Sequence, residues 1–223
     1  MARYTYVISD IHGQYDAFMK LLKKIQFSDE DELYILGDVI DRGSGSIECI
    51  RWIQRQDNVL TLLGNHELML YDGYIHKAQA LYPSLTEIRQ KLDKSEQEEI
   101  MNWIEELPEC KLITVNGRRF YLNHTQAASD SYFKTELTDR MFPDYLIYQE
   151  YNDTVIKNFT CIHGHIPTMQ MRKWHGQQKN SNIWKNKSET IIDIDCGAGY
   201  PEAGGKLGCL RLNDMKEFYV NFV

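Results

Sequence analysis

The stretch LYILGDVIDRG, residues 33–43, joins a short apolar run to a charged loop that contains two glycines. Its first four residues, Leu33 to Leu36, are typical of a buried strand. After the loop, Ile47, Ile50 and Ile53 recur at the spacing of one helix face. A strand that passes through a loop into a helix is one step of a parallel α/β fold, so this stretch indicates the fold class.

The same strand-then-helix pattern flanks this stretch. Residues 4–8 form a β-branched and aromatic run, and Phe18, Leu21 and Ile25 follow at helical spacing. Residues 59–63 form a third apolar run. Alternating strands and helices predict parallel pairing with right-handed crossovers, and ligands then bind beyond the carboxyl ends of the strands. The residues that directly follow each strand are therefore the candidate functional residues.

The second half of the chain predicts a second sheet. Residues 111–115 and 118–122 are strand-like runs joined by Asn116-Gly117, a pair that accepts the positive φ angles of a type I′ hairpin turn. Asp193 and Asp195 alternate with isoleucines in a later run, so we expect both to face a loop or solvent. Together the two halves predict an α/β fold in which a two-sheet β-sandwich is flanked by helices. The β-prone runs in this half that follow the hairpin cover residues 159–162, 190–194, 207–212 and 217–222.

Residues 67–108, between the two halves, are helical in pattern. Ser95-Glu96-Gln97-Glu98 has the form of a capping box ahead of the apolar residues Ile100, Trp103 and Ile104. We expect a helical cap insertion over about residues 68–108. Because no linker or internal repeat interrupts the chain, residues 1–223 are expected to form a single domain.

The composition excludes several classes of protein. A chain of 223 residues with 43% hydrophobic content is long enough to bury a core, which excludes disordered and collagen-like classes. The net charge of −7, with no long Lys/Arg run, argues against nucleic acid as a partner. No run approaches the ~18 apolar residues of a membrane span or the pattern of a signal peptide, so we expect a cytoplasmic protein with no membrane partner.

Potential metal ligands follow each strand. Asp10 and His12 follow the first, Asp38 the second and Asn65 the third, with 28 residues from Asp10 to Asp38 and 27 from Asp38 to Asn65. In the second half, His124 ends the return strand of the hairpin, and His163-Gly164-His165 follows a later strand. These strand ends are expected to converge. Mixed oxygen and nitrogen ligands suit two divalent metals, because a carboxylate can bridge them.

Three motifs, SDIHG (residues 9–13), GDVIDRG (37–43) and GNHE (64–67), resemble the signature of the phosphoprotein phosphatase branch of the calcineurin-like metallophosphoesterases. The chain departs from that signature only in having Ser9 in place of a glycine. The resemblance spans residues 5 to about 210 and implies the family's four-layer αββα fold. It also implies a binuclear centre that holds two divalent ions, manganese first, with iron or zinc as alternatives. The implied ligands are Asp10, His12 and Asp38 on one ion, and Asp38, Asn65, His124 and His165 on the other.

The mechanism that the resemblance implies is direct attack on phosphorus by a hydroxide that bridges the two metals, without a covalent intermediate. His66 is the implied general acid, and Asp41 is expected to orient its ring. Arg42 is the implied phosphate clamp, because its planar guanidinium suits bidentate contact with phosphate oxygens. Asn65 is also implied to contact the substrate.

Two enzymatic functions follow from this resemblance. The leading hypothesis is a serine/threonine phosphoprotein phosphatase type of enzyme, which hydrolyses phosphomonoesters of proteins or small phosphorylated molecules. The alternative is a symmetrical hydrolase of dinucleoside polyphosphates such as bis-adenosyl tetraphosphate, and for this the helical cap would need a slot for a nucleobase. A third hypothesis, an inactive binding scaffold, predicts lost ligands, whereas all six ligand positions are present.

One departure from the family's pattern affects the binding of phosphate. A second phosphate-binding arginine is expected some fifteen residues before Gly164-His165, where this chain has Gln149. Arg140 is a loose substitute for it.

Overall fold

The structure is a computed structural model that describes residues 3–77, 83–126, 141 and 145–222. The strands of its first sheet are β1 (Thr5–Ile8), β2 (Glu32–Ile35), β3 (Val59–Thr61), β9 (Lys206–Arg211) and β10 (Lys216–Asn221). They lie in the order β10-β9-β1-β2-β3. β1, β2 and β3 pair in parallel, as the sequence predicts, and β9 pairs antiparallel to β1 on its other side. The carboxyl ends of β1, β2 and β3 therefore lie at one edge.

The strands of the second sheet are β4 (Cys110–Val115), β5 (Arg118–Asn123), β6 (Thr160–His163), β7 (Trp184–Lys185) and β8 (Ile191–Asp193). They lie in the order β4-β5-β6-β8-β7. The predicted hairpin is β4–β5, and its turn has φ +49° at Asn116 and +78° at Gly117, as a type I′ turn requires. β5, β6 and β8 run parallel to one another, so His124 and His165 follow parallel neighbours. The two-residue strand β7 has no sequence signal of its own.

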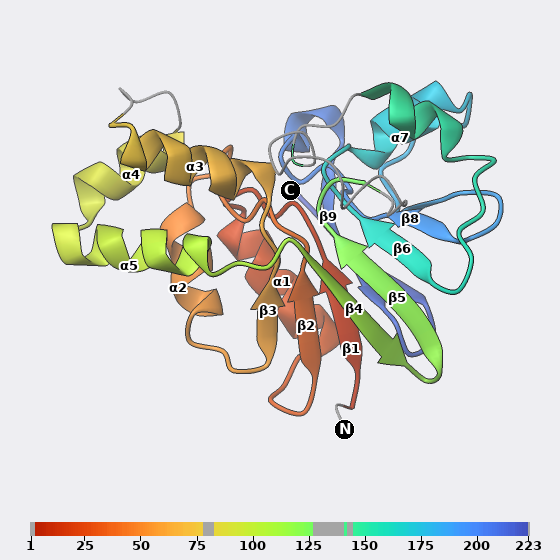
Figure 1. Cartoon of the computed structure of the whole chain (residues 1–223), viewed down its shortest axis with the longest axis horizontal. Helices are drawn as coiled ribbons and strands as arrows, with labels where there is room; N and C mark the ends of the chain where they lie inside the picture. Colours follow the sequence, from red (N-terminus) through yellow and green to blue (C-terminus); the bar gives the residue numbers. More distant parts are fainter. Residues whose placement is uncertain (1–2, 78–82, 127–140, 142–144, 223) are drawn as a thin grey trace.

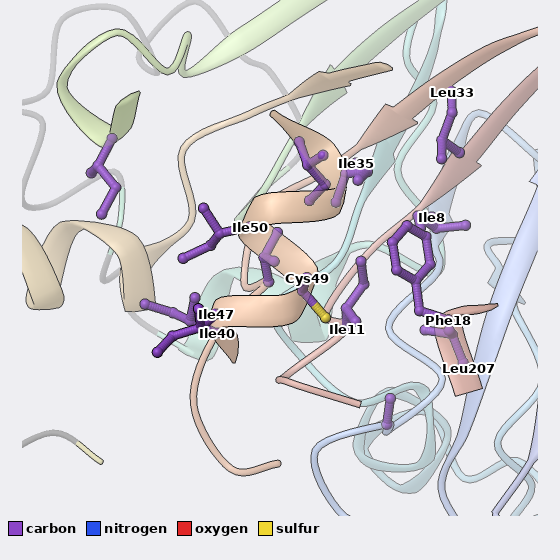
Figure 2. Packing of buried hydrophobic residues seen from close by; sticks show 14 of the residues in the cluster. Ile8, Ile11, Phe18, Leu33, Ile35, Ile40, Ile47, Cys49, Ile50 and Leu207 are labelled. Carbon is purple, nitrogen blue, oxygen red and sulfur yellow. The ribbon is translucent and has the colours of Figure 1, made fainter. Parts of the chain in front are cut away.

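The outer face of the first sheet packs against α1 (Tyr15–Ile25) and α2 (Ser46–Ile53). Figure 2 shows Ile47, Cys49 and Ile50 of α2 among the side chains that fill this layer. Phe18 of α1 lies in the same layer as Ile8 of β1, and both are fully buried. The amphipathic helices that the isoleucine spacing predicts therefore supply one half of the core.

The inner face of the first sheet packs against the second sheet. Val7 and Leu36 belong to one cluster with Phe120 and Ile162, and all four are fully buried. Beyond the second sheet, η2 (Tyr145–Glu150) and α7 (Thr168–Trp174) pack on it through a third cluster that includes the buried Tyr148 and Met171. The layers are thus helix, sheet, sheet and helix, which confirms the expected fold class.

The segment between the two halves contains α3 (Asn65–Ile75), α4 (Pro83–Lys91) and α5 (Lys94–Glu105), grouped at one side of the molecule away from α7 (Figure 1). The capping box of α5 lies two residues earlier than its sequence indicates. Asp93 accepts the N–H of Glu96 at 3.0 Å, and Glu96 accepts the N–H of Asp93 at 3.0 Å. Both Asp93 and Ser95 stand three residues before a glutamate, but α5 begins at Lys94, so Asp93 is the N-cap and Ser95 lies inside the helix. No described helix is long and apolar enough to cross a membrane.

Candidate active site

The loops that follow the strands hold many of the predicted site residues in left-handed backbone conformations. Residues other than glycine rarely adopt these backbone angles, because each such residue costs on the order of 1–2 kcal/mol. Strain of this kind persists only where the surrounding structure fixes it, and it gathers at functional sites. The predicted site residues with φ between +50° and +72° are Asp10, His12, Asp38, Asp41, Arg42 and His165.

Two glycines allow these loops to close on one another. A Cβ on Gly164 would lie 2.1 Å from Ser9 Oγ and 2.2 Å from Asp10 Oδ2. A Cβ on Gly64 would lie 2.3 Å from the backbone nitrogen of Asp38. These distances are shorter than any tolerable contact, so only glycine fits at Gly164, where loops of the two sheets meet, and at Gly64, where two loops of the first sheet meet.

The buried carboxylate of Glu67 ties two of the loops together. It accepts the N–H groups of Asp38 at 2.8 Å, Val39 at 2.9 Å and Gly64 at 3.1 Å. Burial raises the pKa of Glu67 to about 7. Two of these hydrogen bonds fix the backbone of the loop that carries Asp38, and the third joins it to the loop that contains Gly64.

The predicted ligands of the first ion lie at the ends of β1 and β2. Nε2 of His12 is 3.9 Å from Asp10 Oδ1 and 3.7 Å from Asp38 Oδ2. On the other side of the ring, Nδ1 of His12 donates to the carbonyl of Ile40 at 3.0 Å. Because a carbonyl only accepts, the proton sits on Nδ1 and the lone pair of Nε2 faces the carboxylates.

The predicted ligands of the second ion meet around Asn65. Its Oδ1 atom is 2.9 Å from Nε2 of His124 and 2.9 Å from Nδ1 of His165. Nε2 of His124 is also 3.2 Å from Asp38 Oδ1. Asp38 thus contributes one oxygen to each group. Two sets of potential ligand atoms lie within 4.8 Å of one another, His12-Asp38-His66 and Asp38-His124-His165. The first set contains His66, which the sequence assigns to proton transfer, and does not contain the predicted ligand Asp10.

The nitrogen and oxygen atoms of this site suit a bound cation better than they suit hydrogen bonds to one another. Nδ1 of His124 donates to the carbonyl of Leu36 at 2.7 Å, so in the neutral ring Nε2 carries a lone pair that faces two further acceptors, Asn65 Oδ1 and Asp38 Oδ1. Burial lowers the pKa of His124, but the Asp38 carboxylate outweighs it and raises that pKa to about 10. In addition, Asp10 Oδ1 is buried without a hydrogen bond to any described group. A cation among these atoms would satisfy all of them.

His66 and Asp41 form a pair beside this donor set. Nδ1 of His66 lies 2.7 Å from Asp41 Oδ2. The other oxygen of Asp41 accepts the backbone N–H of Ser84 at 3.0 Å and its hydroxyl at 2.6 Å. Burial lowers the pKa of His66, but the carboxylates of Asp38 and Asp41 outweigh it, and the pKa is raised. The first turn of α4 thus positions Asp41, and Asp41 holds the ring of His66.

Arg42 lies against the loop that precedes β9. Its guanidinium carbon is 4.2 Å from the centre of the Tyr200 ring. A Cβ on Gly199 would lie 2.6 Å from Arg42 Cδ and 2.6 Å from the ring of His12, so the loop packs closely over both side chains. Arg42 is exposed. The cation–π contact and the close packing together hold its guanidinium against this loop.

A cavity of about 900 Å³ opens above these groups. Its floor contains Asp38, Asn65, His66 and His165, and Arg42 and Tyr200 lie along one side. The rest of the described lining comes from residues 166–179, which comprise α7 and the segments before and after it. No described residue from 68 to 108 lines the cavity, so the nucleobase slot expected in the helical cap is not found among the described residues of that region.

The model of the calcineurin-like phosphoesterase family matches residues 4–204. The chain belongs to this family. The family is one of phosphoesterases that use divalent metal ions, and the donor set around Asp38 is the candidate metal centre of this member.

Curated relatives of this phosphoesterase are named symmetrical bis(5'-nucleosyl)-tetraphosphatases. The protein from Pasteurella multocida is 32% identical over 132 residues, which cover 56% of this chain and 45% of the relative. The protein from Nitrosococcus oceani is 37% identical over 107 residues, which cover 46% of this chain and 37% of the relative. The matched part of the chain thus spans less than half the length of these relatives.

Solved structures share the fold of this phosphoesterase at low identity. A provisionally assigned diadenosine tetraphosphatase superposes with a TM-score of 0.66 at 17% identity, over 100% of this chain and 96% of the other. A protein serine/threonine phosphatase from Saccharomyces cerevisiae gives 0.62 at 15% identity, over 99% of this chain and 80% of the other. At these identities the likeness shows the fold alone.

Several residues lie elsewhere than the sequence indicates. Asp193 and Asp195 are 0% and 3% exposed, so the expectation that they face solvent is wrong. Asp195 accepts the N–H of Gly197 at 2.8 Å, which agrees with the alternative expectation of a loop. Asp193 accepts the N–H of Asp195 at 3.0 Å, and burial raises its pKa well above the usual range. Gln149 is exposed on η2 and does not line the cavity, and Arg140 lies outside the described residues.

The side of the cavity along α7 was missed by the sequence analysis. Lys173 is on α7 and Lys179 is in the segment that follows it, and both line the cavity. No motif includes these residues, and exposed lysines are common on any surface. The one signal that could have found them is their position after the Gly164-His165 turn, which carries a predicted ligand.

Proposed function

We propose that this phosphoesterase hydrolyses dinucleoside polyphosphates and cuts a symmetrical tetraphosphate into two nucleoside diphosphates. The observation that carries the proposal is the 900 Å³ cavity, which continues from the candidate metal centre along a side that bears Lys173 and Lys179. The names of the curated relatives support the same function. The phosphoprotein phosphatase hypothesis, which the sequence places first, has support from neither observation, because a phosphoserine side chain needs only the floor of such a cavity.

The reaction adds one water across a P–O–P bond. The water oxygen forms a bond to the second phosphorus, and the bond from that phosphorus to the central bridging oxygen, between the second and third phosphorus atoms, breaks. The departing nucleoside diphosphate keeps the electron pair on that oxygen, and the attacked half is released as the second nucleoside diphosphate. Two divalent ions supply activation of water and neutralisation of charge at phosphorus when they are bound. We assign Asp10, His12 and Asp38 to one ion, and Asp38, Asn65, His124 and His165 to the other, with manganese as the proposed metal.

The side chains around the centre orient the substrate and handle the proton. His66 acts as the general acid toward the leaving oxygen, and Asp41 holds its ring through the 2.7 Å contact at Nδ1 so that Nε2 is presented to the reaction. Arg42 clamps the oxygens of the attacked phosphoryl group, with Tyr200 beneath its guanidinium. A phosphate leaving group ionises with a pKa near 6, so it depends less on His66 than an alkoxide does.

The test is turnover by protein that has been stripped of metal and resupplied with manganese. We expect bis-adenosyl tetraphosphate to give ADP as the sole nucleotide product, with a kcat/KM far above that for release of phosphate from a phosphoserine peptide. Asp38→Asn, assayed in parallel, excludes a contaminating phosphatase. A mixture of AMP and ATP would contradict symmetrical cleavage, a preference for the peptide would restore the protein phosphatase hypothesis, and inactivity on both would restore the scaffold hypothesis.

A further inference from the structure

The side of the cavity along α7 carries positive charge that the candidate metal centre does not use. Lys173 and Lys179 line the cavity and are exposed, and neither ammonium group has a hydrogen bond or ion pair to another described residue. Asp38 is the sole carboxylate among the described lining residues, although the whole chain has a net charge of −7. A cationic side in an acidic protein indicates a site for an anion.

The same side also has an apolar part. Ile166, Pro167 and Met169 line the cavity between the candidate metal ligand His165 and the lysines, and the ring of Trp174 lines it further along α7. The Trp174 ring stacks on Tyr148 with centroids 6.1 Å apart and planes 21° apart. An aromatic ring beside lysines suits a nucleoside that carries phosphates, because bases stack on such rings.

Contacts behind this side fix its shape before any ligand binds. Tyr148, beneath Trp174, is fully buried, and its hydroxyl donates to the carbonyl of Thr125, next to the candidate ligand His124. At the far end, Gln177 accepts the indole N–H of Trp184 at 3.0 Å. These contacts fix the position of the α7 side relative to the candidate metal centre. Less conformational entropy is then lost when a ligand binds.

We propose that residues 166–179 form the subsite for the part of the substrate beyond the phosphoryl group at the metal centre. Lys173 and Lys179 bind the additional phosphates, and the apolar strip with Trp174 takes the nucleoside. The inference rests on the proposed function and deepens it. A phosphomonoester has no phosphates to place on these lysines, whereas a dinucleoside polyphosphate does, so the lysines select the longer substrate.

The experiment compares two substrates that differ in length. Bis-adenosyl tetraphosphate would extend over the α7 side, whereas p-nitrophenyl phosphate needs only the floor of the cavity. For Lys173→Ala/Lys179→Ala we expect kcat/KM on the tetraphosphate to fall about a hundredfold, about tenfold for each charged contact, mostly through KM. Turnover of p-nitrophenyl phosphate should stay within about twofold. Lys20→Ala/Lys94→Ala makes the same change in net charge on exposed helix positions outside the cavity and should change neither substrate.

Two results would overturn the subsite. One is an unchanged kcat/KM for the tetraphosphate in the double variant, and the other is an equal loss on both substrates, which would indicate damage to the metal centre. Calorimetric titration of the manganese-loaded protein with ADP separates this outcome from failure of the proposed function. If the wild type does not cleave the tetraphosphate but binds ADP at least tenfold more tightly than the double variant, the subsite stands and the proposed function falls. Equal binding by both proteins removes the subsite.

Discussion

The floor and the α7 side of the cavity are built in opposite ways. At the candidate metal centre, which reaches the floor through Asp38, the side chains of Asp38, His12 and His124 are buried. Backbone hydrogen bonds and left-handed φ angles fix the loops that carry Asp38 and His12. On the α7 side, Lys173 and Lys179 are exposed and lie outside the left-handed region. The side chains assigned to chemistry are therefore each fixed by several contacts with their surroundings. The side chains assigned to substrate choice have no such contacts, so they can be substituted without disturbing the fold.

Asp38→Asn should have the largest effect, because Asp38 contributes an oxygen to both groups of potential ligands. We expect at least about a thousandfold loss of turnover together with loss of bound metal. Metal content by elemental analysis and the rise in melting temperature on addition of manganese both report the binding. Full metal occupancy in this variant would remove Asp38 from the bridging position.

His66→Asn should lower turnover by about two to three orders of magnitude while the metal content stays at the wild-type level, because His66 is assigned to proton transfer and not to a metal. The loss should be larger for an alkyl phosphomonoester than for the tetraphosphate, whose leaving oxygen is less basic. Equal losses on the two substrates would argue that His66 has a structural role or binds metal.

Gly164→Ala should cost roughly ten- to a hundredfold in turnover and lower the melting temperature, since the new Cβ would displace Ser9 and Asp10 from the metal centre. Gly117→Ala is the matched control. A Cβ there meets nothing within 4 Å, but φ is +78°, so it should weaken the hairpin and leave turnover unchanged. Normal metal binding in Gly164→Ala would show that the loops can move apart.

Tyr200→Ala should have the smallest effect. Its ring holds the Arg42 guanidinium at 4.2 Å, and a partly exposed cation–π contact contributes about 0.5–1 kcal/mol. We expect KM to rise about two- to fivefold with kcat and metal content unchanged. Tyr200→Phe keeps the ring and should restore KM, so a Phe variant as weak as the Ala variant would assign the effect to the hydroxyl.

The floor could be predicted from the sequence because its residues directly follow strands whose pattern is plain. Asp10, Asp38 and Asn65 come after three apolar runs, and parallel pairing brings such ends together. The hairpin could also be predicted, because the local pair Asn116-Gly117 determines its turn. Both predictions depend on short-range patterns that tertiary packing does not reverse.

The α7 side and the aspartates of β8 could not be predicted in the same way. The alternation of Asp193 and Asp195 shows that they share a face, but the burial of that face depends on packing by a different part of the chain. Lys173 and Lys179 look like ordinary surface lysines until the cavity beside them is seen. Tertiary context, which no local pattern contains, decides both cases.

The strand order of the first sheet has a consequence for synthesis on the ribosome. β1 lies between β2 and β9, so the strand that leads to Asp10 lacks one of its two neighbours until residues 206–211 have been translated. His165, whose N–H binds Asp10 at 3.0 Å, also emerges late. A nascent chain therefore carries an open edge of β1 until β9 has been translated, and the candidate metal centre cannot assemble in full until His165 has emerged.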